Sequence, residues 1–309
     1  VAALSILVIF VGYSSYALLL IRSHANPPMN QNGPDNVLSL GSYLSREQYG
    51  ETPLLYGQTF RSTVMYQLKD DGYSYDILRR PGKTIWSKAV KTSPDQPDSY
   101  VAHNESYKYE MTPKMLFPRM YSTAGQHPRA YLEWIGATEA DLETVETPVV
   151  VDQDGNTVQT AAVQRPSFAQ NLAYFFNYQV NHMYWRYFMW NFVGRQSDIQ
   201  PTDAIITDGN WLSGIKWIDE LYLGPQDNLP DEIANNKGRN TYYFLPFLLG
   251  LIGLIYQLNR DPRNFSIVMW LFVMMGIALV VYFNTSPNEP RERDYVYAGS
   301  FYAFCIWIG

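Results

Sequence analysis

Three segments of about 20 residues contain no charged side chain, and they constrain the fold more than any other feature. They cover residues 1–21, 240–259 and 264–284. A helix needs about 20 predominantly apolar residues to cross the roughly 30 Å core of a bilayer, so each segment is long enough to span. A further apolar run begins at residue 300 and reaches the end of the sequence. We therefore expect transmembrane helices in all three segments and the start of another at 300–309.

Two other interpretations of these segments remain open. The first could be a secretory signal peptide, although it lacks a basic start and a small-residue cleavage site. The other two could be buried core helices, but Pro246, several glycines and aromatic ends are typical of membrane helices. Because the sequence begins and stops inside apolar runs, we expect it to be a fragment of a larger multi-pass protein.

The short link at 260–263 sets the expected orientation. It carries Arg260 and Arg263, and positive charge in short loops marks the cytoplasmic side. The long region 22–239 and the loop 285–299 then face outward. The predicted fold is an integral membrane α-helical protein with a large mixed α+β extracytoplasmic region between its first and second spans.

The 22–239 region has the composition of a folded outer domain. It holds all but four of the 29 acidic residues and all but four of the 23 basic ones, so its net charge is about -6. This balance argues against nucleic acid as a partner. Asp154-Gly155 between two β-rich runs predicts a hairpin. Apolar spacing within 36–50 predicts a short amphipathic helix.

Residues 167–194 predict an aromatic helix. Ser167 followed by Gln170 fits a capping box, and Gly194 fits a helix stop. The segment is too polar in its first half to span a bilayer. We interpret it as a helix lying at the membrane interface or buried beneath the outer domain, with an ordinary core helix as the alternative.

The loop 285–299 carries the densest charge in the chain. Arg291 and Arg293 offer planar donors suited to phosphate, while Glu292 and Asp294 are bases or partners for those guanidiniums. A loop between two spans lies at headgroup level, where a lipid-linked phosphate would be presented. An ion-pair network that pins the loop to the outer domain explains the same residues equally well.

Few other groups carry a chemical signal. The single Cys305 excludes an internal disulfide, and the four histidines show no ligand spacing, so we expect no metal site and see no evident cofactor. The three complete spans lack ionisable side chains, which counts against a transporter. Aromatic residues make up 16% of the chain, which suits membrane interfaces and sugar faces alike.

Four strings carry a family resemblance: GYSSYALLLIRSHANPP, YLSREQYGETPLLYG, HMYWRYFMWNFVGRQSDIQ and PNEPRERDYVYAGSFYAF. Together they resemble a bacterial envelope family of multi-pass proteins that is related to the transmembrane protein O-mannosyltransferases of the GT-C glycosyltransferase superfamily. The resemblance implies an inner-membrane enzyme with its large loop in the periplasm. It would transfer a sugar from a polyprenyl-phosphate donor to Ser or Thr of acceptor envelope proteins.

The resemblance also bears on site residues. The catalytic carboxylate of such enzymes lies in the first outer loop, so the principal base is expected upstream of Val1. Arg291 and Arg293 would bind the donor phosphate, with the two neighbouring carboxylates fixing their geometry. Arg186 and Arg195 are weaker candidates, for which capping and interfacial snorkelling are alternatives. A membrane-anchored binding or assembly module for secretion or polysaccharide export is the second functional hypothesis.

Overall fold

The computed structural model of the protein describes residues 2–30, 32–45, 52–82, 84–93, 96–97, 99–103, 107–201 and 208–309. Its contacts divide the chain into two units, which are treated separately. The smaller unit comprises Val1–Glu51 and Arg79–Lys108, and the larger unit comprises Thr52–Leu78 and Tyr109–Gly309.

The smaller unit contains two helices and short strand pairs. The apolar helix α1 is followed by α2, which begins after a capping box between Asn36 and Ser39. This is the helix expected within 36–50; residues 46–50 of that expectation lie outside the described residues. Strand β4 pairs with β7, and β5 with β6. The bounds are α1 Ala2–His24, α2 Val37–Leu44, β4 Arg79–Pro81, β5 Ile85–Lys88, β6 Tyr100–His103 and β7 Tyr107–Tyr109.

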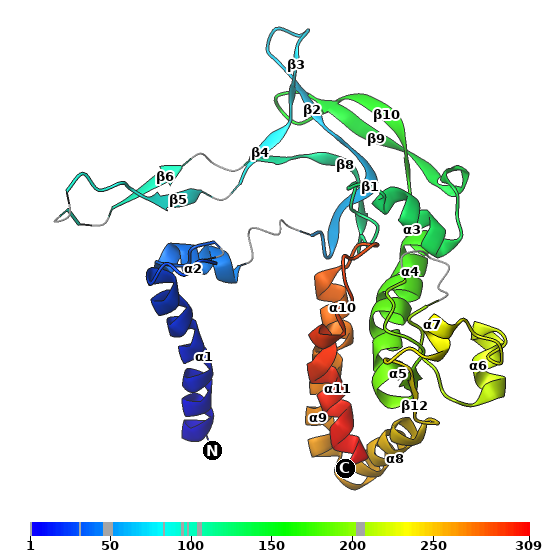
Figure 1. The fold of residues 1–309 in the computed structure, drawn as a ribbon. Coiled ribbons are helices and arrows are strands. Elements are labelled where there is room, and N and C mark those ends of the chain that lie inside the picture. The colour runs from blue at the N-terminus through cyan, green and yellow to red at the C-terminus, as the bar shows by residue number, and fades with distance from the viewer. Residues whose placement is uncertain are drawn as a thin grey trace. The chain divides into compact units, whose positions relative to one another are not determined.

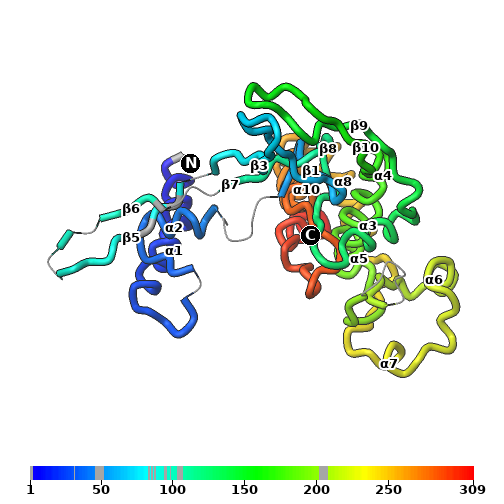
Figure 2. The backbone as a smooth tube through the Cα atoms, turned by 90° about the horizontal axis from the view of Figure 1, so that it is seen from above, coloured from blue at the N-terminus to red at the C-terminus, as the bar shows by residue number. Residues whose placement is uncertain are grey.

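Two sheets form the outer part of the larger unit (Figure 1). Strand β1 (Tyr56–Val64) pairs antiparallel with β8 (Met111–Leu116). A four-stranded sheet has the order β10-β9-β2-β3, and its bounds are β2 Tyr66–Leu68, β3 Tyr75–Ile77, β9 Glu143–Val151 and β10 Thr157–Arg165. The β9–β10 hairpin turns at Asp154-Gly155, where Gly155 has a φ of 84°, so the predicted hairpin is confirmed. Figure 2 shows this hairpin over the ends of the helices.

One long helix connects the sheets to the apolar helices. It consists of α4 (Phe168–Tyr174), a π-helical stretch η3 (Phe175–Trp185) and α5 (Arg186–Phe192). The capping box between Ser167 and Gln170 is present as predicted. Most side chains of η3 and α5 are buried in the aromatic core of the unit. The helix is thus buried, as expected both for a helix beneath the outer domain and for the ordinary core helix that was its alternative.

The apolar helices of the larger unit pack against this helix and against one another. They are α8 (Leu245–Arg260), α9 (Pro262–Met274), α10 (Ile277–Phe283) and α11 (Ala298–Ile308). A Cβ at Gly253 would overlap the carbonyl of Trp307, so glycine allows α8 and α11 to approach closely. The remaining short elements are α3 His127–Ile135, η2 Glu139–Asp141, β11 Gly194–Arg195, α6 Lys216–Leu223, α7 Asp231–Ala234, β12 Asn240–Thr241 and η4 Asp294–Tyr297.

Two described helices are long and apolar enough to cross a membrane by length and composition, at Ala3–His24 and Pro262–Phe283. These coincide with the first and third predicted spans. The fold is therefore a mixed α+β region bracketed by two long apolar helices. Helix α8 begins at Leu245 instead of Asn240 and has only 16 residues, because Asn240 and Thr241 pair with β11. Helix α11 begins at Ala298, slightly before the predicted start.

Candidate functional site

The loop that follows α10 is attached along the first half of η3. Asn284 ends α10 in the left-handed conformation, with a φ of 45°. The hydroxyls of Tyr174 and Tyr178 donate to the carbonyls of Thr285 and Ser286, each at 3.2 Å. Both carbonyls lie in the loop, just beyond the last residue of α10. The helix α4–η3–α5 therefore fixes where the charged residues of the loop begin.

Glu292 forms the strongest contact of the loop, and its partner is Arg186. The two side chains pair bidentately, with Nη1–Oε1 at 3.0 Å and Nη2–Oε2 at 2.8 Å. The Tyr187 hydroxyl also donates to Glu292. Arg186 is 4% exposed, and it donates further to the carbonyls of His182 and Gly209. A buried charge needs such complete pairing, so Arg186 is a structural anchor for the loop.

Arg293 and Glu289 form a second pair, with Nη2–Oε2 at 2.7 Å. Burial raises the pKa of the Glu289 carboxyl, and the charge of Arg293 opposes that rise. The Glu289 carbonyl accepts from Gln200 Nε2 at 2.7 Å. The Arg293 backbone N–H donates to the Tyr187 hydroxyl at 3.3 Å. The second half of the loop is thus pinned to the same helix as the first.

Arg291 is bound much less tightly than the other two arginines. Its Nη2 donates to the Tyr295 hydroxyl at 3.3 Å, and within the described residues it takes part in no ion pair. Asp294 accepts from the backbone N–H of Tyr295 at 3.0 Å, which is a turn contact. Arg291 is therefore the loop guanidinium that is most available to an added anion.

The structure differs from the sequence hypothesis in the partners of the two loop carboxylates. Glu292 and Asp294 do not hold Arg291 and Arg293, because Glu292 bonds to Arg186 from 106 residues away and Asp294 bonds to backbone. Arg186 directly follows η3, and its Nε donates to the His182 carbonyl at 3.0 Å, which is a capping contact of the kind given as an alternative role. Arg195 lies over the Trp190 ring at 3.8 Å and donates to the Ser197 carbonyl, outside the cavity described next.

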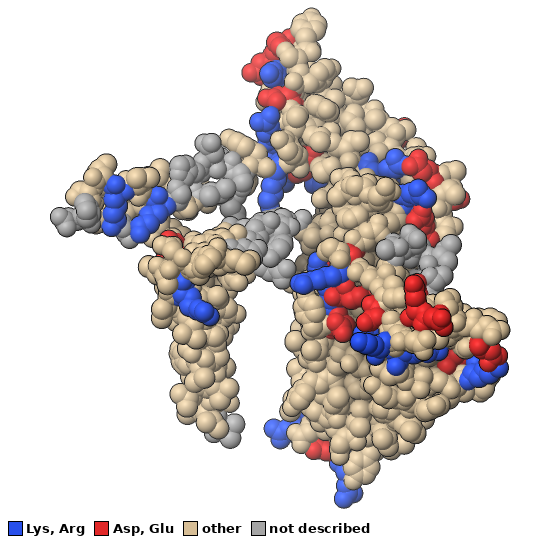
Figure 3. Space-filling model, in the orientation of Figure 1, with Lys and Arg blue, Asp and Glu red and all other residues tan. Residues whose placement is uncertain are grey.

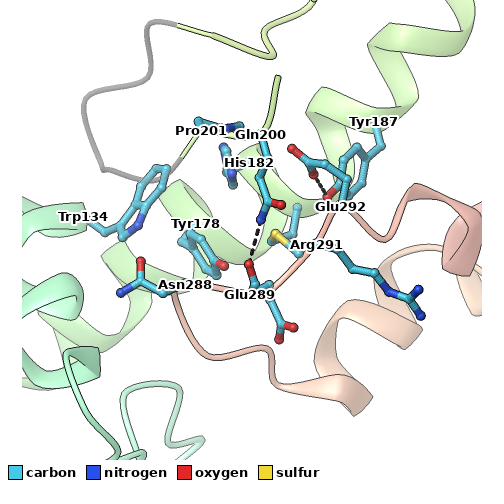
Figure 4. Close-up of a pocket in the computed structure, with 11 residues that line it drawn as sticks. Trp134, Tyr178, His182, Tyr187, Gln200, Pro201, Asn288, Glu289, Arg291 and Glu292 are labelled. Atoms are coloured by element: carbon cyan, nitrogen blue, oxygen red, sulfur yellow. Dashed lines mark hydrogen bonds between the residues drawn. The ribbon is translucent and has the colours of Figure 1, made fainter. Parts of the chain in front are cut away.

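A cavity of about 280 Å³ opens between the loop, η3 and α3. Figure 4 shows the rings of Trp134, Tyr178 and His182 on one side, and Glu292 and Arg291 on the other. The guanidinium of Arg291 extends away from the rings. The full lining consists of Trp134, Tyr178, His182, Met183, Tyr187, Gln200, Pro201, Asn288, Glu289, Arg291 and Glu292. Aromatic and amide side chains thus line one space, and the Arg291 guanidinium extends from its edge.

His182 is the polar group of this cavity that most lacks a partner. It is 7% exposed, and its Nδ1 is buried without a hydrogen bond in the part of the chain that the structure describes. Its ring stacks on Tyr178 at 5.5 Å and lies 4.8 Å from the Trp134 ring. Burial, assisted by the charge of Arg186, lowers the pKa of His182 well below its ordinary value. His182 is therefore a neutral imidazole with free hydrogen-bonding capacity.

The sequence hypotheses did not include His182, Glu289 or Trp134 as site residues. Trp134 comes from α3, and no local pattern relates it to a loop so far away in the chain. His182 gave no usable signal either, because η3 is π-helical and a regular helical spacing does not describe which of its side chains share a face. No group of three or more His, Cys, Asp or Glu that could hold a metal occurs among the described residues.

Comparison with known protein families gives a match to part of the chain. Residues 50–176 match DUF8416, a family of unknown function. This segment includes Trp134 but ends before His182 and the charged loop. No curated protein matches the chain. No solved structure matches it either. A relationship to the O-mannosyltransferases therefore remains a prediction from the resemblance.

Proposed function

We propose that the chain is the membrane-anchored part of a glycosyltransferase that uses a polyprenyl-phosphate sugar, and that the cavity receives the phosphate-bearing end of this donor. The observation that carries the proposal is Arg291. It is a guanidinium without an ion pair among the described residues, and it stands beside an aromatic cavity. A planar cation of this kind is well suited to bidentate binding of phosphate.

The distribution of charge supports a membrane position for the helices beside this cavity. No charged residue occurs between Arg263 and Glu289 or after Asp294. On the face in Figure 3, an uncharged band separates the charges at the lower end of the helices from those of the loop. A helix of the length of Pro262–Phe283 covers roughly 33 Å at 1.5 Å per residue, which matches a bilayer core.

This arrangement would place the cavity at the lipid headgroups. The loop lies at the end of the 262–283 helix opposite to Arg260 and Arg263. The positive charge of that short link favours the cytoplasm, so we place the cavity on the periplasmic face of the inner membrane. The phosphate of a lipid-linked sugar would then contact Arg291 while it stays in the headgroup layer of the membrane.

The other cavity groups suit a hydroxyl-rich headgroup. Apolar ring faces such as that of Trp134 stack on sugars, and the amides of Gln200 and Asn288 can exchange hydrogen bonds with hydroxyls. The unpartnered His182 can do the same. These groups would orient the sugar, while Arg291 would stabilise negative charge on the departing phosphate.

One observation favours the second function, a binding or assembly module. The two carboxylates of the cavity, Glu289 and Glu292, are both engaged with arginines, so the described lining offers no free carboxylate to accept a hydroxyl proton. The transferase proposal therefore needs its base outside this lining. Transfer of label from a labelled polyprenyl-phosphate hexose to envelope proteins separates the two functions, since a module would bind the lipid without transferring its sugar.

Binding to protein in lipid nanodiscs tests the phosphate site. We expect Arg291→Ala to weaken affinity for a polyprenyl-phosphate hexose about 10-fold or more, the usual cost of a lost charge-assisted hydrogen bond. Arg129→Ala is the matched control, because Arg129 is an exposed arginine paired with Glu133 on α3. Equal affinity of both variants and the wild type would overturn the proposal.

A further inference from the structure

Three aromatic side chains form a stacked row along the helix that carries the cavity wall. Tyr174, Tyr178 and His182 follow one another at intervals of four residues. The first two rings lie 5.2 Å apart with an interplanar angle of 18°, and the second and third lie 5.5 Å apart with an angle of 20°. The first ring is outside the cavity lining, whereas the other two belong to it. The row therefore begins in α4 and ends with the imidazole at the cavity.

The first two rings of the row bond to the charged loop, and the third does not. Tyr174 and Tyr178 donate to the carbonyls of Thr285 and Ser286. His182 Nδ1 has no hydrogen bond within the described residues, although the side chain is only 7% exposed. Buried polar atoms in folded proteins are nearly always paired. The row thus leaves its last member without the oxygen partner that the other two have.

The loop does not supply that partner further along its course. Asn288 adopts a left-handed conformation with a φ of 60°, and the carbonyl of Glu289 accepts from Gln200. All three of these residues line the cavity together with His182. A ligand in the cavity would therefore lie beside the imidazole and could complete the row.

The state of the imidazole determines which ligand group fits best. Because burial keeps the ring of His182 neutral, one of its nitrogens donates and the other accepts. A hydroxyl can both accept and donate, so it pairs with either nitrogen. An ionised phosphate oxygen only accepts, and an ammonium group only donates. Trp134, 4.8 Å from the imidazole, adds an aromatic ring to the same wall (Figure 4), which suits the apolar face of a sugar.

We propose that His182 distinguishes the sugar-bearing donor lipid from the spent carrier, the polyprenyl phosphate that remains after transfer, through a hydrogen bond to a hydroxyl of the sugar. This inference rests on the proposed function. Both lipids carry the phosphate that would contact Arg291, but only the donor has a hydroxyl for His182. A site built to bond a hydroxyl discriminates against a ligand that lacks it, because its own polar group is then left unpaired. The spent carrier would leave the cavity more readily than the donor.

The affinities of the wild type and His182→Phe for the two lipids test this inference in nanodiscs. Phenylalanine keeps a ring for the stack but has no nitrogen. We expect His182→Phe to bind a polyprenyl-phosphate hexose about 10-fold more weakly, the usual size of one hydrogen bond, and polyprenyl phosphate as the wild type does. His127→Phe is the matched control, because His127 also contacts a tyrosine ring but lies outside the cavity lining.

Arg291→Ala separates failure of this inference from failure of the proposed function. It should weaken binding of both lipids alike, because both carry the phosphate. If Arg291→Ala bound both lipids as the wild type does, the phosphate site and the proposed function would fail. If it weakened both, but His182→Phe weakened neither lipid or both equally, the inference about His182 alone would be overturned.

Nitrogen-15 NMR of the imidazole gives a test that does not depend on the folding of His182→Phe. The labelled protein retains His182, and its other three histidines, all outside the cavity lining, are replaced by glutamine. We expect the polyprenyl-phosphate hexose to shift the ring-nitrogen signals and polyprenyl phosphate to leave them in place. Equal shifts with both lipids, or no shift with either, would contradict the assigned role of His182.

Discussion

Two buried arginines of the larger unit, Arg119 and Arg186, both hold a positive charge away from water, but different groups compensate the two charges. Arg119 is completely buried and donates to the carbonyls of Val281 and Leu54 at 2.9 and 2.7 Å, with its guanidinium 3.8 Å from the Phe117 ring centre. Burial lowers its pKa to about 10. Arg186 instead forms an ion pair with the carboxylate of Glu292 in the loop.

The polar groups around Arg119 are enclosed by the protein, and we call them the closed cluster. Those around Arg186 lie beside the cavity, and we call them the open cluster. Around Arg119, Asn284 donates to the carbonyls of Pro53 and Pro118. Arg119 Nε and Gln179 Oε1 are buried there without a partner among the described residues, but neither side chain lines the cavity. Around Arg186, the ion pair is complete, but the nearby Arg291 and His182 keep unused hydrogen-bonding capacity. The closed cluster holds the end of α10 in place, whereas the open cluster adjoins the cavity, where a ligand can reach its polar groups.

Removal of Glu292 should have the largest effect on stability. Glu292→Ala leaves the Arg186 charge buried without its partner, and breaking such a pair costs about 3–5 kcal/mol. We expect this loss in the free energy of unfolding, measured by chemical denaturation in nanodiscs. Arg186→Met combined with Glu292→Leu should recover most of it, because no charge then remains buried. If the double variant were as unstable as Glu292→Ala, the loss of stability would not come from the unpaired charge of Arg186.

Arg119→Met should cost somewhat less, about 2–3 kcal/mol. It leaves the carbonyls of Leu54 and Val281 without donors, but it also removes a buried charge. The same denaturation experiment measures the effect. Donor affinity of the folded protein should stay unchanged, because Arg119 does not line the cavity. A loss of affinity at unchanged stability would mean that the two clusters are not distinct.

The sequence predicted those features of the molecule that depend on neighbouring residues. The capping box at Ser167 and the turn at Gly155 are local, and both are present. The start of α8 was placed too early, because the pairing of Asn240 with Arg195 joins residues distant in the sequence and interrupts an apolar run. Long-range pairing overrides local composition in this way.

The candidate site likewise depends on contacts between residues that are distant in the sequence. The density of charged residues in the sequence indicated the loop as a candidate site. It did not indicate which of these residues form ion pairs. The partner of Glu292 lies 106 residues away, and Trp134 joins the cavity only because α3 packs against η3. The π-helical turns of η3 also change which side chains share a face, so a regular helical spacing could not assign His182 to the cavity.

His182 should make the stability of the open cluster depend on pH. Its pKa in the folded protein is lowered by burial, so below about pH 6.5 the unfolded chain binds a proton that the folded one excludes. Stability should therefore fall as the pH decreases from 7 to 5, by at most about 1.4 kcal/mol per pH unit from this residue.

The difference between the wild type and His182→Phe at each pH isolates this contribution, because the ring can still stack on Tyr178. His127→Phe is the matched control. The pKa of His127 is also lowered by burial, but its ring bonds to Ser122 and is less enclosed. Parallel stability curves for the wild type and His182→Phe would show that His182 is not held neutral by its surroundings.

Arg291→Ala should have the smallest effect on stability and so separates binding from folding most clearly. Within the described residues its guanidinium makes one long hydrogen bond, to the exposed Tyr295, and lies 5.8 Å from the centre of that ring. Loss of such surface contacts changes the free energy of unfolding by no more than about 0.5 kcal/mol. Donor affinity should nevertheless fall. Arg291→Lys, which keeps the charge but not the planar fork, should give an intermediate affinity at the same stability. If Arg291→Ala proved as destabilising as Arg119→Met, Arg291 would belong to the framework of the loop, and the loop would be a closed cluster like that at the end of α10.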